Sequence, residues 1–198
     1  MSAKIDKKRL ELSLNKIIDG EVNIKENVTL SDWLCIKEAI SPVNNYVSHE
    51  LTMLFINNVD RFVDGISKQE KSRLQQEYEN KSANSPGYDV VFEGEKIKLI
   101  AEVKANVRFE KKGFGSMQKT QLKKDVDGLL NGKSTSPIKP ADFLKIQVML
   151  DYNNGIFSTK KAVEEFCAKE MNVQLLADKL TSNSDRTKVY FVLISDLK

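Results

Sequence analysis

The stretch from Pro86 to Asn106 constrains the fold of this chain more than any other. Its second half, residues 97–105, alternates strictly between two faces. One face carries Ile97, Leu99, Ala101, Val103 and Ala105, and the other carries Lys96, Lys98, Ile100, Glu102 and Lys104. A period of two residues is typical of a β-strand. With residues 88–92 as a first strand, the pattern predicts a β-hairpin in which Glu102 and Lys104 are neighbours on one face.

The position of Asp89 follows from the length of the turn. A two-residue loop that begins at Gly94 suits a type II′ turn. Asp89 then lies opposite Ile100, and Glu102 lies on the adjacent diagonal, about 7–8 Å away at Cα and within reach of a shared ion. A four-residue loop is expected to give the same pairing, whereas a three-residue loop would turn Asp89 to the other face. The expected geometry is two carboxylates converging on one point of a sheet, with Lys104 beside them.

These residue types suit a magnesium site. Mg²⁺ is typically held by one or two carboxylates together with waters and substrate phosphates. Asp89 and Glu102 can supply the carboxylates, and the backbone carbonyl of Val103 can supply a further oxygen. A bound ion of this kind activates water and offsets charge on phosphorus oxygens, and Lys104 can stabilise the same charge. The pattern therefore predicts phosphodiester hydrolysis.

An Asp at the start of one strand, a turn, and then Glu-Val-Lys in the next strand resembles the PD-(D/E)XK nuclease superfamily. The resemblance covers the hairpin and the order of the elements around it. It implies that Asp89 and Glu102 bind the metal and that Lys104 is the catalytic lysine. Many members add an acid from a preceding helix, for which Glu50 is the candidate. The chain departs from the family pattern in one place, because Tyr88 and not proline precedes Asp89.

The residues outside the hairpin indicate which subtype of this superfamily the chain resembles. The Gln-x-x-x-Tyr pattern of RecB-like members is missing, because Gln121 is followed four residues later by Asp125 and Gln118 by Leu122. A chain of this size with a helical first half and a polar arm resembles a type II restriction endonuclease most. That resemblance implies cleavage of double-stranded DNA at a specific site, a homodimer and a companion DNA methyltransferase. A repair or junction-resolving nuclease and a toxin-like nuclease are the alternatives within the superfamily.

Positive charge follows the hairpin directly. Residues 104–139 contain nine Lys or Arg against three acids, although the whole chain has a net charge of only +3. Such a segment suits a polyanionic substrate, and it equally suits a solvated helix face. The candidate DNA-binding residues, with the glutamines and Lys119 expected on exposed faces, are Asn106, Arg108, Lys111, Lys112, Gln118, Lys119 and Gln121.

Composition sets the broad class. No apolar run approaches the roughly 18 residues of a membrane helix, and the charged N-terminus has no signal-peptide core. Two cysteines without metal-ligand spacing indicate a reducing, cytoplasmic setting. The single histidine, His49, excludes zinc sites built on several histidines.

The element pattern predicts an α/β fold, a restriction-endonuclease-like mixed β-sheet of four to five strands flanked by helices. We expect a single nuclease domain over 1–198, with a helical part at 1–66, a polar arm or loop at 67–86 and a catalytic core at 87–198. The expected elements are helices at 31–40 and 41–57, the second restarting at Ser41-Pro42, a helix at 116–131, a strand at 143–150, a helix capped by Ser158 and a strand at 188–195. Within the polar arm, residues 67–80 can form an exposed helix. The pattern at 173–180 fits a helix or a strand, and we favour the helix.

Two hypotheses outside catalysis remain open. The same fold can serve a non-catalytic DNA-binding or assembly protein, although such a chain would have no chemical need for Asp89, Glu102 and Lys104 together. The hairpin charges can also be a chance feature of an ordinary α/β domain.

Overall fold

The computed structural model describes residues 29–79, 81, 86–105, 109–110, 113–151 and 158–195. The chain divides into two compact units, residues 1–42 and 43–198. The second unit contains the sheet and the whole of the candidate site. None of the described helices combines the length and the apolar character needed to cross a membrane.

Helix α2 (Leu30–Asn57) is continuous, with Pro42 inside it. The prediction of two helices that break at Ser41-Pro42 is therefore wrong. An internal proline removes one helical hydrogen bond and costs about 3 kcal/mol in an isolated helix. The last turns of α2 bury Leu51 and Phe55 in the core, and this packing stabilises the helix more than local preference does.

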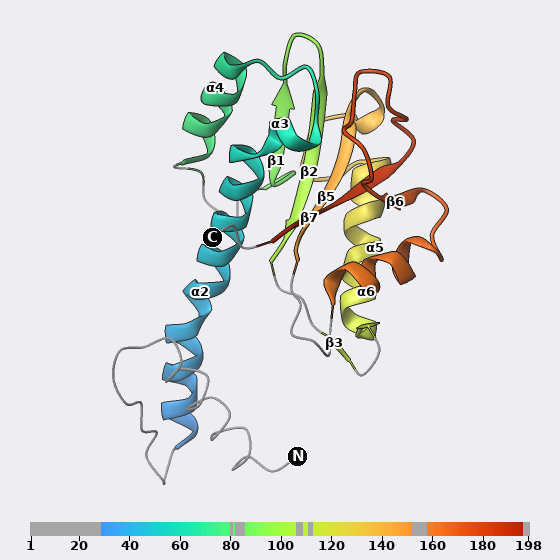
Figure 1. The fold of residues 1–198 in the computed structure, drawn as a ribbon. Coiled ribbons are helices and arrows are strands. Elements are labelled where there is room, and N and C mark those ends of the chain that lie inside the picture. The colour runs from blue at the N-terminus through green and yellow to red at the C-terminus, as the bar shows by residue number, and fades with distance from the viewer. Residues whose placement is uncertain are drawn as a thin grey trace. The chain divides into compact units, whose positions relative to one another are not determined.

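Five strands form the main sheet, in the order β1-β2-β5-β7-β6 (Figure 1). Strand β1 (Val90–Glu93) is antiparallel to β2 (Lys98–Lys104), and the other neighbouring pairs are parallel. The parallel strands are β5 (Leu144–Leu150), β7 (Val189–Ile194) and β6 (Val173–Leu175). The predicted strands at 143–150 and 188–195 are thus confirmed, as is a mixed sheet of four to five strands.

Helices cover both faces of this sheet (Figure 1). The later turns of α2, with α3 (Val59–Phe62) and α4 (Lys68–Glu79), pack on one face. Helices α5 (Ser116–Asn131) and α6 (Thr159–Cys167) pack on the other. Leu99 and Ala101 of β2 face the first group and Ile100 faces the second. The predicted alternation along β2 is confirmed, so Glu102 and Lys104 point toward α5.

Helix α4 falls in the segment predicted to be a polar arm or loop. A capping box begins it, because Ser67 Oγ accepts a hydrogen bond from Glu70 N while the Glu70 carboxylate accepts from Ser67 N. Leu74 and Tyr78 are buried in the core. The Tyr78 hydroxyl also accepts a hydrogen bond from Val91 N, at 2.7 Å, on the outer edge of β1. The helix therefore covers an edge strand that would otherwise present free backbone groups.

The hairpin turn lies one residue further along the chain than predicted. Gly94 N donates to Ile97 O, which leaves Glu95 and Lys96 as the two loop residues. Glu95 N donates to the Glu70 carboxylate, so α4 helps to fix this turn. A shift of one residue in the turn moves every cross-strand partner by two residues.

The pairing predicted for Asp89 is wrong for this reason. Val91, and not Asp89, pairs with Ile100, and Val90 pairs with Ala101. Continuing this register places Asp89 opposite Glu102. The expectation that Asp89 and Glu102 are near neighbours survives, because a shift of two residues keeps the same face.

The C-terminal part differs from the prediction at one element. Residues 173–175 form strand β6, and not the first turn of a helix. Residues 173–175 pair with residues 189–191 of β7 and bury Val173, so tertiary pairing overrides a weak local preference. The N-cap of α6 is as predicted, since Ser158 Oγ accepts from Lys161 N. The remaining elements are β3 (Phe109–Glu110), β4 (Gly113–Phe114) and the 3-10 turn η1 (Pro140–Asp142).

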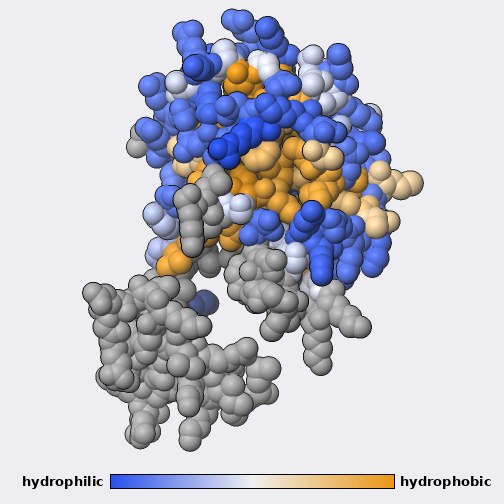
Figure 2. Space-filling view, viewed as in Figure 1, coloured by the Kyte–Doolittle hydropathy of each residue, from blue (hydrophilic) through white to orange (hydrophobic). Residues whose placement is uncertain are grey.

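Apolar side chains also reach the surface in the middle of one face, surrounded by hydrophilic ones (Figure 2). Strand β6 pairs only with residues 189–191 of β7 and therefore does not cover residues 192–194 of that strand. A pocket of about 550 Å³ involves Phe62, Leu176 and Val192. None of the acids or lysines of the candidate site lines this pocket.

Candidate active site

Asp89 lies just before β1 and binds the backbone of the neighbouring strand. Its Oδ2 accepts a hydrogen bond from Val103 N at 2.7 Å, so the side chain continues the β1-β2 ladder beyond the end of β1. Burial raises the pKa of the Asp89 carboxyl above its usual value, while this hydrogen bond and the charge of Lys133 act in the opposite direction. Asp89 is therefore held at the end of the hairpin by a backbone hydrogen bond, and none of the described lysines or arginines forms an ion pair with it.

Glu102 is the most buried acid of the site, with 6 % of the residue exposed. Burial, and next the negative charge of Asp89, raise the pKa of the Glu102 carboxyl to about 7. Lys133 opposes this shift and Asp125 adds to it. The charge of Asp89 thus reaches Glu102 in a place where a negative charge is poorly solvated.

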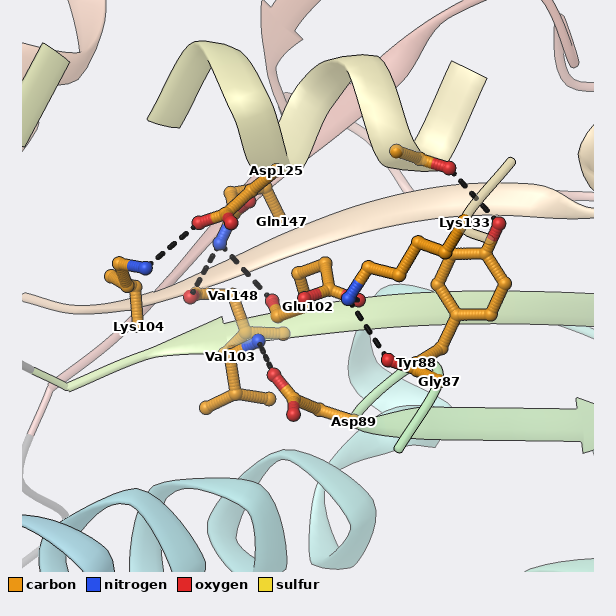
Figure 3. Close-up of polar contacts among 11 residues, drawn as sticks. Gly87, Tyr88, Asp89, Glu102, Val103, Lys104, Asp125, Lys133, Gln147 and Val148 are labelled. Atoms are coloured by element: carbon orange, nitrogen blue, oxygen red, sulfur yellow. Dashed lines mark hydrogen bonds and ion pairs between the residues drawn. The ribbon is translucent and has the colours of Figure 1, made fainter. Parts of the chain in front are cut away.

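Lys133 is the direct partner of Glu102. Its Nζ lies 2.6 Å from Glu102 Oε1 and donates a hydrogen bond to Gly87 O at 2.9 Å. The same ammonium lies 5.4 Å from the centre of the Tyr88 ring. Figure 3 shows the side chain crossing from the end of α5 to the hairpin.

Lys104 faces α5, where its Nζ lies 2.9 Å from Asp125 Oδ2. Both side chains are largely, but not fully, shielded from solvent. Lys104 is therefore on the predicted face of β2, next to Glu102 in the alternation. It is paired with a helix acid and not with either carboxylate of the hairpin.

Gln147 lies under this cluster in β5, in register with Glu102. Its side chain is fully buried, and Nε2 is within 3.2 Å of Glu102 O and 3.4 Å of Val148 O. Because both carbonyls accept from the amide nitrogen, Oε1 points elsewhere and has no hydrogen-bond partner. A buried acceptor of this kind favours a water or a cation in the adjacent space.

The other predicted residues have different outcomes. Glu50 is exposed on α2 and makes no hydrogen bond or ion pair with the described site residues. Gln118 is buried on α5, so the expectation that it is exposed is wrong, because it lies on the same helical stripe as Leu122. Lys119 and Gln121 are exposed as expected. Four candidates lie outside the described residues: Asn106, Arg108, Lys111 and Lys112.

The donor set fits a magnesium ion. Among the residues that the structure describes, no three His, Cys, Asp or Glu side chains form a ready-made metal cluster. Mg²⁺ needs only one or two carboxylates, because waters and phosphates complete its shell. When Glu102 is ionised, the three carboxylates of Asp89, Glu102 and Asp125 outnumber the two ammonium groups of Lys104 and Lys133. The excess of negative charge around a carboxyl with a pKa near 7 is what a divalent cation would offset.

Three functional candidates were missed in the sequence. Lys133 and Asp125 stand 31 and 23 positions after Glu102 in the numbering, and Gln147 stands on a different strand. A buried polar residue inside the apolar run 144–150 is the one local signal that pointed to Gln147. Nothing local marks Lys133, because only the turn after α5 returns it to the hairpin.

No protein-family model, no curated protein and no solved structure matches this chain.

Proposed function

We propose that this protein is a Mg²⁺-dependent DNA endonuclease that hydrolyses phosphodiester bonds. The observation that carries the proposal is the arrangement on β2 and its partner strand. Asp89 and Glu102 are two shielded carboxylates, and burial raises the pKa of each. The charge of Asp89 adds to the shift in the pKa of Glu102, and Lys104 stands on the same face of β2, two residues after Glu102. The resemblance of these three residues to the PD-(D/E)XK pattern supports the same reaction.

The acids and the lysine of the site would have separate roles. Asp89 and Glu102 would hold the ion, with the Val103 carbonyl as a further oxygen, while the hydrogen bond from Val103 N fixes the direction of the Asp89 carboxylate. The ion supplies activation of a water molecule and offsets charge on the phosphate. Lys104 would stabilise the negative charge that develops on the phosphate oxygens, and Asp125 holds its ammonium in place.

Incubation of the purified protein with supercoiled plasmid tests the reaction class. We expect cleavage with Mg²⁺ and none with EDTA. Discrete fragments support a type II restriction enzyme, and a smear supports a nonspecific nuclease. A junction-resolving or repair enzyme would instead prefer branched or damaged DNA over the plasmid.

The variant Lys104→Ala links that reaction to the site. It should lose cleavage while a gel-shift assay still detects DNA binding, because one cation contributes little to total phosphate affinity. Lys98→Ala is the matched control, since Lys98 is on the same strand but pairs with Glu93 at the other end of the hairpin. Cleavage by Lys104→Ala at the wild-type rate would show that the assignment is wrong.

A non-catalytic DNA-binding or assembly protein is the second candidate. One observation favours it, because Glu102 and Lys104 already have ion partners in Lys133 and Asp125. Such internal pairing is also what a purely structural charge cluster would contain. DNA binding without cleavage, at every divalent cation tried, would favour this candidate over the nuclease.

A further inference from the structure

Lys133 reaches Glu102 by a route that depends on two glycines. Helix α5 ends at Asn131 and is followed by Gly132, whose φ of +98° is a conformation that side-chain-bearing residues rarely adopt. The Lys133 side chain then lies against the last turn of α5, at Gly128. Lys133 therefore starts beside the end of α5 and points toward the hairpin.

The side chain of Lys133 then passes over Gly128. A Cβ at position 128 would lie 3.2 Å from Lys133 Cγ and 3.3 Å from Cε, and the three atoms nearest to it all belong to Lys133. Glycine inside a helix costs about 1 kcal/mol relative to alanine. The side chain of Lys133 thus fills the space that the missing Cβ of Gly128 leaves open.

The far end of the route is fixed by the hairpin. The ammonium lies 2.6 Å from Glu102 Oε1 and donates to Gly87 O. Tyr88 closes one side, and its hydroxyl donates to Gly128 O at 2.9 Å. The ammonium of Lys133 therefore lies against one oxygen of Glu102, a carboxylate that the proposed function assigns to the metal.

We propose that Lys133 is an internal counter-ion of Glu102 that competes with a divalent cation for this carboxylate and so sets the cation affinity of the site. The inference rests on the proposed function, because it takes Glu102 as a metal ligand. Without a divalent cation, Lys133 neutralises Glu102. A divalent cation held by the same carboxylate would be repelled by the ammonium, so its binding would favour displacement of Lys133 from Glu102 Oε1.

Two variants remove the competition in different ways. Lys133→Met keeps an unbranched apolar chain but deletes the charge. Gly128→Ala keeps the charge but places a methyl group against the lysine chain, and it should not weaken α5, because alanine is the better helix former. The matched control is Lys139→Met, a change of the same type at an exposed lysine in the same connection between α5 and β5.

Isothermal titration calorimetry with Mg²⁺ and, separately, Mn²⁺ measures the outcome without DNA and without catalysis. We expect Lys133→Met to bind at least about tenfold more tightly than wild type and Gly128→Ala to bind about two- to fivefold more tightly, with Lys139→Met unchanged. Circular dichroism melting curves establish that each variant is folded. If Lys133→Met does not fold, Gly128→Ala decides the question.

The failures of the two proposals can be told apart. If wild type binds the cation, Glu102→Gln abolishes binding and Lys133→Met binds no more tightly than wild type, the counter-ion role is overturned while the metal site stands. If neither wild type nor any variant binds either cation, both the counter-ion role and the proposed metal site are overturned.

Discussion

The ammonium of Lys104 lies 2.9 Å from the carboxylate of Asp125, which joins the central hairpin to the middle of α5. On the proposed function, this contact fixes where Lys104 can place its charge. Asp125→Asn keeps the size of the side chain but removes the ion pair. We expect the single-turnover rate of DNA cleavage to fall about 10- to 100-fold, because a small displacement of a catalytic group reduces the reaction rate by up to this factor.

Asp127→Asn is the control for this change. Asp127 is on the same helix but is exposed, and its carboxylate accepts a hydrogen bond from Asn131. Equal cleavage rates for the two asparagine variants would contradict a positioning role for Asp125.

The raised pKa of Glu102 predicts how stability depends on pH. In the folded chain the carboxyl has a pKa of about 7, compared with 4.5 for the free side chain. Between these values the folded state binds more protons than the unfolded state, so the free energy of unfolding should fall as pH rises. The loss is about 2–3 kcal/mol between pH 4.5 and pH 7.5 if no cation is present.

Urea unfolding in EDTA at pH 5 and pH 8 measures this slope. Glu102→Gln should lose most of it, and at pH 8 the variant should be more stable than wild type. Glu93→Gln, at the exposed end of the same hairpin, should keep the wild-type slope. A Glu102→Gln variant with the same pH slope as wild type would refute this interpretation.

Addition of Mg²⁺ should reverse the trend. A cation that binds the folded state at 100 times its dissociation constant stabilises it by about 2.7 kcal/mol. Binding requires an ionised Glu102, so the rise in melting temperature should be larger at pH 8 than at pH 6. Equal rises at the two pH values would place the bound ion away from Glu102.

Tyr78 gives a prediction about the fold itself. Its hydroxyl is the partner of Val91 N on the outer edge of β1. Tyr78→Phe leaves this backbone group without its partner, and we expect a loss of about 1–2 kcal/mol in the free energy of unfolding. Tyr46→Phe, at a tyrosine that is 64% exposed, should change stability little. Urea unfolding of both variants measures the difference.

Local sequence patterns predicted much of the sheet. Strict alternation in residues 97–105 predicted the faces of β2, and the apolar run at 188–195 predicted β7. Both patterns reflect which side of a strand is buried, which the chain encodes residue by residue. Ser158 as a helix cap is local in the same way.

The errors arose where distant residues decide the outcome. The hairpin turn was placed one residue too early, because Glu70 of α4 helps to hold Glu95 N. Residues 173–175, expected to begin a helix, form a strand because β7 pairs with them. Pro42 was expected to break a helix whose later turns are held by tertiary packing.

The candidate site was predicted in part for the same reason. Asp89, Glu102 and Lys104 belong to one hairpin, so counting residues places them near one another. The ion partners of Glu102 and Lys104 come from α5 and the turn after it. No spacing rule connects Lys133 to Glu102, and only the packing of α5 on the sheet brings them together.

Cleavage of DNA by Glu102→Gln and Glu93→Gln, compared in parallel with wild type, tests the central claim most directly. The two changes are chemically identical and lie on the same hairpin, but only Glu102 belongs to the candidate site. With plasmid DNA and Mg²⁺, we predict that Glu93→Gln cuts at the wild-type rate and that Glu102→Gln shows no cleavage. Cleavage by Glu102→Gln at the rate of Glu93→Gln would contradict the assignment of this site as a metal-dependent nuclease centre.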